Sequence, residues 1–401
     1  MRALMTFVVA VVFACSAFAA GTTDIDESKL SPEAKALKAK YDEALQKLQD
    51  EFATELAALQ SRVEKVEKTS AAPAKKNWYD NIRINGYMQT RYWARDYKST
   101  SAELDDFGVR RYYMNLIASY EKGQLVATYA GAGADFREGA NADWENLFVD
   151  YRPKPEFNIR MGLVPTLFGL DTAESSAVRL PMERSLVSEG NLTLGLAGLY
   201  AYGPSDLGVW LMYDTRPKPH LTVPIPNNPG LRVDFTVHNG QFEKTDKNDN
   251  KNVGIDAEYF TNWGQFGASW LDGKYTRTLT GGSNVTEPRK AFGLNFRAYP
   301  NMLIDGWGFQ GEWIDGEWLG TDRDGWYGQA SYHFKGHPGV AYTRYERFDP
   351  NDAAANDDYK GLHLGYKYSL TPQDDVTLEY CDGEVGDKTA DELIVQYQRS
   401  Y

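Results

Sequence analysis

From Trp78 to the last residue, apolar and polar side chains alternate with a period of two. Between positions 231 and 239, for example, Val233, Phe235 and Val237 are separated by charged or polar residues. Successive side chains of a β-strand point to opposite faces, so this pattern predicts strands with one apolar and one polar face. Because the same alternation recurs in segment after segment, we expect one all-β domain over residues 78–401.

The length of these segments and of their connections points to a barrel that crosses a membrane. Segments of about ten residues are long enough for a tilted strand to span a bilayer, and Tyr, Trp and Phe recur at their ends. Short and long connections alternate, as in outer-membrane barrels. The expected short turns are 122–123, 152–155, 203–206, 262–264, 335–338 and 369–373, and the expected long loops are 98–106, 170–191, 241–252, 278–287, 349–358 and 382–391. The sequence therefore predicts a transmembrane antiparallel β-barrel.

The number of strands follows from a parity argument. The clearly alternating segments are odd in number, yet the first begins and the last ends on the short-turn side, which requires an even number. One strand is therefore hidden, and the proline-rich stretch 216–230 is where a short strand such as 221–225 would escape notice. We expect about 18 strands, with about 16 as the alternative.

The residues before the barrel predict a leader and a helix. Residues 1–20 combine Arg2, an apolar core and small residues around Phe18, as in a secretory signal peptide; a lipoprotein signal cleaved before Cys15 is the alternative. Residues 28–68 contain no glycine and carry a narrow apolar stripe. The stripe predicts a periplasmic coiled coil, with a single solvated helix or one folded against the rest of the chain as alternatives. Residues 69–77 form a small-residue linker.

Composition excludes several function classes. The chain has 43 basic and 56 acidic residues and a net charge of -13, which gives no electrostatic support for binding nucleic acid. One of the two cysteines lies in the leader, so the mature chain forms no internal disulfide. The five histidines are scattered, and no serine-nucleophile or haem-attachment motif accompanies them. Stretches 246–250 and 322–325 lack the full ligand spacing of a calcium loop. We expect no enzyme, no cofactor and no metal.

If the apolar face meets lipid, the polar face lines a lumen. The basic residues assigned to it are Arg83, Arg91, Arg95, Arg111, Arg160, Arg232, Arg297, Lys335, Arg344 and Lys367, and the acidic ones are Asp234, Asp256, Glu258, Glu312, Glu346 and Glu379. Charged rings set the ion preference of a pore, so this net positive wall predicts a mild preference for anions. In the alternative, arginines and carboxylates pair with one another, fix the shape of the barrel and select weakly.

Residues 170–191 form the most informative loop. It carries charged residues that we assign to a constriction, namely Asp171, Glu174, Arg179, Glu183 and Arg184, together with apolar residues that include Leu170 and Leu186. A loop of this mixed character is suited to folding into a barrel, because its apolar side chains can pack on the wall while its charges face the channel. The alternative is an extracellular loop that covers the mouth.

Two short stretches resemble a known family. Residues 161–171 (Met-Gly-Leu-Val-Pro-Thr-Leu-Phe-Gly-Leu-Asp), followed by 182–186 (Met-Glu-Arg-Ser-Leu) and Gly195, resemble phosphate-selective porins O and P, and Val-His-Asn-Gly at 237–240 is similar to a strand end of that family. The resemblance implies a trimeric outer-membrane channel for small anions or general solutes. Where the family commonly has Pro-Gly-Arg, this chain has Glu-Gly-Asn at 189–191, which favours a general diffusion porin.

The sequence therefore predicts a porin in contact with outer-membrane lipid and lipopolysaccharide. We expect a homotrimer that passes small hydrophilic solutes by passive diffusion, with a mild preference for anions such as phosphate. The alternative function is a tether, in which the helix reaches the cell wall and basic residues such as Lys35, Lys38 and Lys40 contact peptidoglycan.

Overall fold

The computed structural model divides the chain into two compact units, Met1–Lys76 and Asn77–Tyr401, each described by itself. The described residues are 78–97, 102–132, 142–165, 168–188, 190–191, 196–197, 205–216, 228–241, 246, 248–279, 282–385 and 388–401, with Pro32, Lys40, Glu43, Gln46, Lys47, Asp50 and Thr54 before them. These seven earlier positions are helical. The predicted signal peptide (1–20) and linker (69–77), and most of the predicted helix (28–68), lie outside the described residues.

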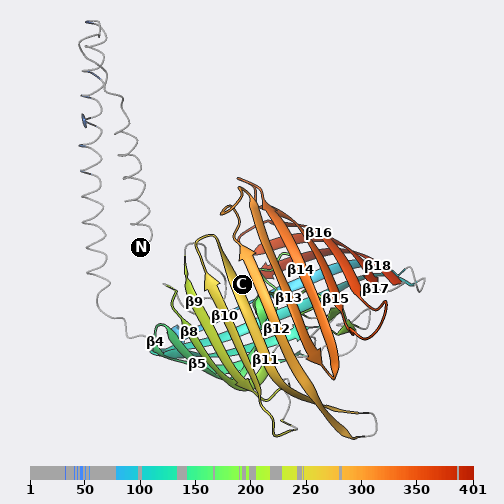
Figure 1. The fold of residues 1–401 in the computed structure, drawn as a ribbon. Coiled ribbons are helices and arrows are strands. Elements are labelled where there is room, and N and C mark those ends of the chain that lie inside the picture. The colour runs from blue at the N-terminus through green and yellow to red at the C-terminus, as the bar shows by residue number, and fades with distance from the viewer. Residues whose placement is uncertain are drawn as a thin grey trace. The chain divides into compact units, whose positions relative to one another are not determined.

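The second unit is a closed antiparallel barrel of sixteen strands (Figure 1). The strands are β1 (Ile82–Tyr97), β2 (Ala102–Tyr120), β3 (Gly123–Ala132), β4 (Ala142–Lys154), β5 (Phe157–Pro165), β8 (Ser205–Asp214), β9 (Gly230–His238), β10 (Asn252–Phe260), β11 (Gly264–Thr278), β12 (Asn284–Ala298), β13 (Trp307–Trp318), β14 (Thr321–His333), β15 (Gly339–Asp349), β16 (Tyr359–Ser369), β17 (Asp374–Val385) and β18 (Lys388–Ser400). Each pairs with its neighbour in chain order, and β1 closes the ring against β18. A 3-10 helix, η2 (Trp78–Asn81), precedes β1.

The expectation of about 18 strands is wrong, because neither the connection from β5 to β8 nor the one from β8 to β9 adds a strand to the barrel. Strand β5 pairs directly with β8, and β8 and β9 pair directly with each other. Their register runs from Gly208 opposite His238 to Asp214 opposite Arg232. The stretch between them therefore connects two neighbouring strands and adds none to the barrel; within it, the suggested strand 221–225 lies outside the described residues. Two further short strands, β6 (Gly190–Asn191) and β7 (Leu196–Ala197), pair only with each other in a separate sheet.

Most of the expected turns agree with the strand ends. Strands end and restart around 262–264, 335–338 and 369–373 as predicted. The predicted turn 203–206 is wrong, because Ser205 and Asp206 already belong to β8 and pair with β5. The predicted long loop 382–391 is also wrong, since β17 and β18 remain paired as far as Val385 and Lys388.

The two faces of the strands separate as the alternation predicts. On β12 the outward residues Phe292, Leu294 and Phe296 are 41%, 47% and 44% exposed. On β9 the inward residues Arg232 and Asp234 are buried. This distribution is the reverse of a water-soluble sandwich and matches a barrel whose outer surface meets lipid. Among the described residues, no helix is both long enough and apolar enough to cross a bilayer.

Candidate functional site

Residues 168–188, which we call the inner loop, follow β5 and run through the inside of the barrel. The loop begins with the short helix α3 (Gly169–Ala173). The amide of Gly169 donates to Ser269 Oγ on β11 at 2.9 Å, whereas Gln398 on β18 donates to the carbonyl of Ala177 at 2.9 Å. Gln89 on β1 also donates to the carbonyl of Ser176 at 3.1 Å. A segment that meets inward side chains of strands this far apart in the ring has to pass through its interior.

Apolar side chains attach the inner loop to one part of the wall. The buried cluster contains Phe168, Leu186 and Val187 from the loop and Leu271, Ala291, Ile314, Trp318, Tyr327, Phe348 and Tyr359 from strands β11 to β16. Leu170 is also buried, whereas Val178 is 45% exposed. Burial of this much apolar surface stabilises the loop in its position. The inward-facing apolar residues of β13 to β16 were not predicted, since the inner face was expected to be polar.

Three arginines surround the carboxylate of Glu183 in the inner loop. Arg110 Nε lies 2.7 Å from Glu183 Oε1, Arg111 Nη2 lies 3.0 Å from Oε2, and Arg91 forms a third ion pair. Burial raises the pKa of the Glu183 carboxyl, but the three guanidinium groups outweigh it and hold this pKa well below its ordinary value. We call this group the Glu183 cluster.

Arg110 reaches the Glu183 cluster because β2 has a bulge. The register of β1 and β2 shifts between Gln89 and Thr90, where Gln89 lies opposite Arg111 and Thr90 lies opposite Val109. Arg110 is thus the extra residue, and a bulge turns neighbouring side chains toward the same face. Strict alternation would have placed Arg110 on the lipid face. Two consecutive arginines in a strand expected to cross the membrane were the signal in the sequence that could have revealed the bulge.

The other charged residues assigned to the loop also have partners. Asp171 accepts a hydrogen bond from the Ser185 amide at 2.5 Å. Burial raises the pKa of Asp171, but Arg179, Arg344 and Arg184 outweigh it, so the pKa lies below the ordinary value. Glu174 lies 2.7 Å from Arg297 on β12. Arg179 donates to Ser176 Oγ at 2.7 Å, and Arg184 donates to the Asp171 carbonyl at 3.3 Å.

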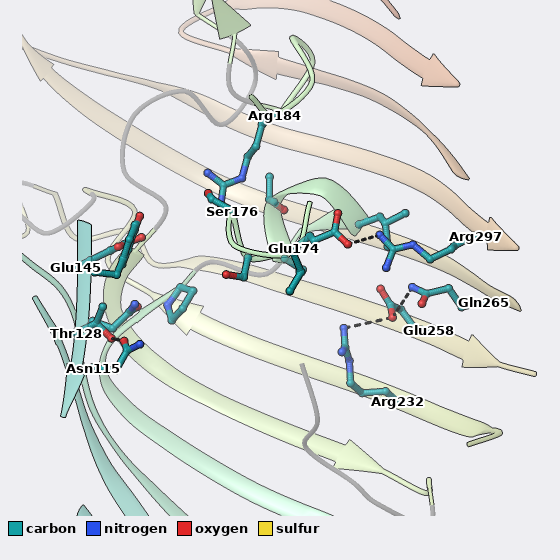
Figure 2. Close-up of a pocket in the computed structure, with 18 of the residues that line it drawn as sticks. Asn115, Thr128, Glu145, Glu174, Ser176, Arg184, Arg232, Glu258, Gln265 and Arg297 are labelled. Carbon is teal, nitrogen blue, oxygen red and sulfur yellow. Dashed lines mark hydrogen bonds and ion pairs between the residues drawn. The ribbon is translucent and has the colours of Figure 1, made fainter. Parts of the chain in front are cut away.

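A cavity of about 330 Å³ lies between the inner loop and the wall formed by β1–β5 and β9–β12 (Figure 2). In Figure 2, Asn115, Thr128 and Glu145 gather on one side, and Arg232 and Glu258 lie on the other. The charged lining residues are Arg184, Arg216, Arg232, Arg297, Glu145, Glu174 and Glu258. Hydroxyl groups of the inner loop, including Ser175 and Ser176, also line the cavity, together with apolar and aromatic side chains such as Leu170 and Phe260. The cavity therefore has a mixed surface, in which charged groups lie among apolar ones.

The carboxylates predicted on β9 and β10 surround one arginine. Arg232 Nε lies 3.0 Å from Asp234, and its Nη2 lies 3.3 Å from Asp256 and 3.5 Å from Glu258. The register places Asp256 opposite Asp234 and Glu258 opposite Arg232. We call this group the Arg232 cluster. It lies within two adjacent strands.

The structure distributes the predicted basic lining residues over several environments. Arg232 and Arg297 line the cavity, whereas Arg91, Arg111 and Arg344 are buried and donate to the inner loop. Arg160 pairs with Asp150 at 2.7 Å, and Lys367 pairs with Asp375 at 3.1 Å. Arg83 and Lys335 are exposed. The side chain of Arg95 lies outside the described part of the chain.

Sequence reasoning missed three residues that the structure places at the site, namely Arg110, Glu145 and Arg216. Arg216 forms an ion pair with Asp214 at 2.6 Å, and their spacing of two residues was a signal that could have indicated this pair.

One group of carboxylates has the spacing of metal ligands. Asp324, Asp349 and Asp352 each present an oxygen within 4.8 Å of the others. They lie at the ends of β14 and β15 and in the turn that follows, away from the cavity-lining residues. Surface acidic groups of this kind are common without an ion.

Comparison with known proteins identifies the family. The family described as "Phosphate-selective porin O and P" matches residues 82–395. The chain belongs to this family. Membership of this family and the closed barrel support an outer-membrane channel of the porin type. No curated protein matches the chain.

Solved structures share the fold of this porin. An anion-selective porin from Comamonas acidovorans matches with a TM-score of 0.56 and 14% identity, covering 80% of this chain and 99% of that chain. OmpT of Vibrio cholerae matches with a TM-score of 0.51 and 12% identity, covering 80% and 97%. The outer-membrane channel DcaP of Acinetobacter baumannii matches with a TM-score of 0.52 and 9% identity, covering 80% and 97%. At these identities the comparison establishes a shared barrel fold.

Proposed function

We propose that this porin conducts small hydrophilic solutes by passive diffusion, with a mild preference for anions. The observation that carries the proposal is the cavity with charged lining residues between the inner loop and the wall. Its lining contains four arginines and three glutamates, and the Glu183 cluster adds three arginines to one glutamate at the inner loop. Because the charge along a pore sets which ions enter, this modest basic excess favours anions weakly.

The pairing of the arginines argues for a general anion preference rather than a site built for phosphate. Phosphate is bound most strongly when several guanidinium donors converge on it. In the cavity, Arg297 is already paired with Glu174, and Arg232 with three carboxylates. Their donors are therefore partly engaged, and phosphate would compete with these carboxylates. We infer that the inner loop narrows the channel, with Asp171, Glu174, Arg179, Glu183 and Arg184 as its charged residues.

Conductance in a planar bilayer tests this proposal. The mature chain would be refolded, checked for a heat-modifiable barrel and inserted into the bilayer under a gradient of KCl. We expect stable conductance steps and a reversal potential displaced toward that of chloride. A folded barrel without conductance would overturn the channel proposal. Conduction with a reversal potential displaced toward potassium would overturn the anion preference alone.

Assembly and the N-terminal region form a second part of the proposal. We propose a homotrimer in contact with lipid and lipopolysaccharide, exported by signal peptide 1–20 and carrying a periplasmic coiled coil at 28–68. A Vibrio cholerae OmpT structure described as a trimer form, with 11% identity and a TM-score of 0.52, supports the trimer. Chemical cross-linking of intact outer membranes tests it, and a single monomeric band would contradict it. Co-sedimentation with peptidoglycan tests the tethering alternative.

A further inference from the structure

Three buried glutamates on alternate strands meet the backbone of the inner loop. Glu312 on β13 accepts the amides of Leu170 and Asp171, at 2.9 and 3.2 Å. On β17, Glu379 accepts the amide of Met182 at 2.9 Å. On β15, Glu346 accepts the amide of Leu186 at 3.0 Å. The contacts bracket the loop from its first helical turn to its last described residues.

These three carboxyl groups are buried, and burying a carboxyl group is unfavourable unless it forms hydrogen bonds. Glu312, Glu346 and Glu379 are 4%, 2% and 1% exposed. Removing a carboxyl group from water costs free energy that hydrogen bonds have to offset. The donors supplied here include backbone amides, which only a substitution by proline would remove. Both oxygens of Glu312 are used in this way, one for each amide.

The wall around Glu346 and Glu379 fixes the orientation of these two side chains. His363 lies between two of them, with Nε2 2.7 Å from Glu346 and Nδ1 3.1 Å from Glu379. The Tyr342 hydroxyl donates to Glu379 at 2.5 Å. Arg344 donates to the carbonyl of Glu183 at 3.0 Å, so the same part of the wall also holds a loop carbonyl. Glu346 and Glu379 are therefore themselves held in place by the wall.

The position of the loop divides the interior into two sides. On the side of β11 to β16, the loop side chains Phe168, Leu186 and Val187 fill the space against the apolar residues of the wall. On the side of β1–β5 and β9–β12, the cavity remains open. We propose that Glu312, Glu346 and Glu379 are positioning residues that hold the inner loop against one side of the barrel and confine permeation to the cavity on the other. This inference rests on the proposed channel function.

Replacing the glutamates by glutamine tests the inference with little change in volume. A glutamine offers one acceptor oxygen, and its NH2 group repels an amide donor. Glu312→Gln is the cleanest variant, because Glu346 and Glu379 also contact His363. Glu317→Gln is the matched control on the same strand, since Glu317 is 29% exposed and pairs with Lys290 at 3.9 Å.

We expect the triple variant to raise the unit conductance about twofold, with added open-channel noise, because the side of the barrel that the loop fills would open. We expect E312Q to change it less and E317Q to leave it unchanged.

Two measurements distinguish a displaced inner loop from a barrel that is only less stable. They also test this inference separately from the proposed channel function. A merely destabilised barrel would give fewer insertions of unchanged unit conductance, whereas a displaced loop changes every channel. The rate of amide hydrogen exchange of residues 168–188 shows how firmly the inner loop is held, whether or not the protein conducts. We expect these amides to exchange at least about tenfold faster in E312Q than in the wild type. Unchanged exchange in folded E312Q would overturn the inference. Absence of conductance from the wild type with faster exchange in E312Q would overturn only the proposed function.

Discussion

The Glu183 cluster and the Arg232 cluster are mirror images in charge. In the first, one carboxylate meets three guanidinium groups; in the second, one guanidinium meets three carboxylates. The first joins the inner loop to β1 and β2, whereas the second lies within the neighbouring strands β9 and β10. A cluster inside one hairpin shapes the wall, but a cluster between loop and wall also fixes the width of the passage. Loss of the central residue should therefore have different consequences in the two places.

The largest effect is expected for Glu183→Gln. The change leaves three guanidinium groups facing one another, and arginine cannot lose its proton at neutral pH. Glu183 is 32% exposed, so water offsets part of the cost, and we expect the free energy of unfolding to fall by about 3 kcal/mol. Urea titration of the barrel in detergent, followed by tryptophan fluorescence, measures it. Added chloride or phosphate should restore part of the loss, because either anion can replace the carboxylate. A loss below about 1 kcal/mol would contradict this view of the cluster.

Arg232→Gln is the mirror experiment and should have a smaller effect. Three carboxylates would remain without their cation. A carboxylate can be neutralised by taking up a proton from water, whereas a guanidinium group cannot be neutralised by losing one. We expect a loss of about 2 kcal/mol at neutral pH. Because Arg232 lines the cavity, the reversal potential in a KCl gradient should also move toward that of potassium. If R232Q destabilises the barrel more than E183Q does, the proposed difference between the clusters is wrong.

Acidification should act on the Glu183 cluster with a defined sign. The folded-state pKa of Glu183 lies well below its ordinary value, so its contribution is complete above the unfolded value of about 4.3 and is lost as the pH falls through the folded value. The stability difference between wild type and E183Q should therefore shrink by about 2 kcal/mol between neutral pH and pH 3. Parallel urea titrations along this pH series measure it. A difference that stays constant down to pH 3 would show that the carboxylate charge does not carry the effect.

The smallest effect is expected for Arg110→Gln. This variant tests how much the arginine that the bulge turns inward contributes to the Glu183 cluster. Two arginines would still contact Glu183, so we expect a loss of about 1 kcal/mol. Arg277→Gln serves as control, because Arg277 is 43% exposed and pairs with Glu287 at 2.9 Å in a peripheral position. The control should change stability by less than about 0.5 kcal/mol. Equal losses in both variants would indicate that Arg110 behaves as an ordinary surface residue.

Local geometry explains which parts of the site could be predicted. Arg232 and Asp234 are two residues apart on one strand, and Asp256 and Glu258 are two apart on the next. Side chains with this spacing share a face, so adjacency of the strands was enough to bring them together. Arg110 was missed because its placement depends on a bulge. The number of strands was overestimated because periodicity does not reveal which strands pair, and here β5 pairs directly with β8, and β8 with β9, across long connections.

The sequence by itself determined a barrel with a polar interior and an apolar exterior. That property is local, since the direction of a strand side chain depends only on its position in a two-residue repeat. Only the tertiary structure decided where the inner loop lies and which residues hold it. The amides of Leu186 and Met182 meet carboxylates 160 and 197 residues further along the chain. Contacts at that separation exist only once the ring of strands has closed, because closure brings β13, β15 and β17 around the loop.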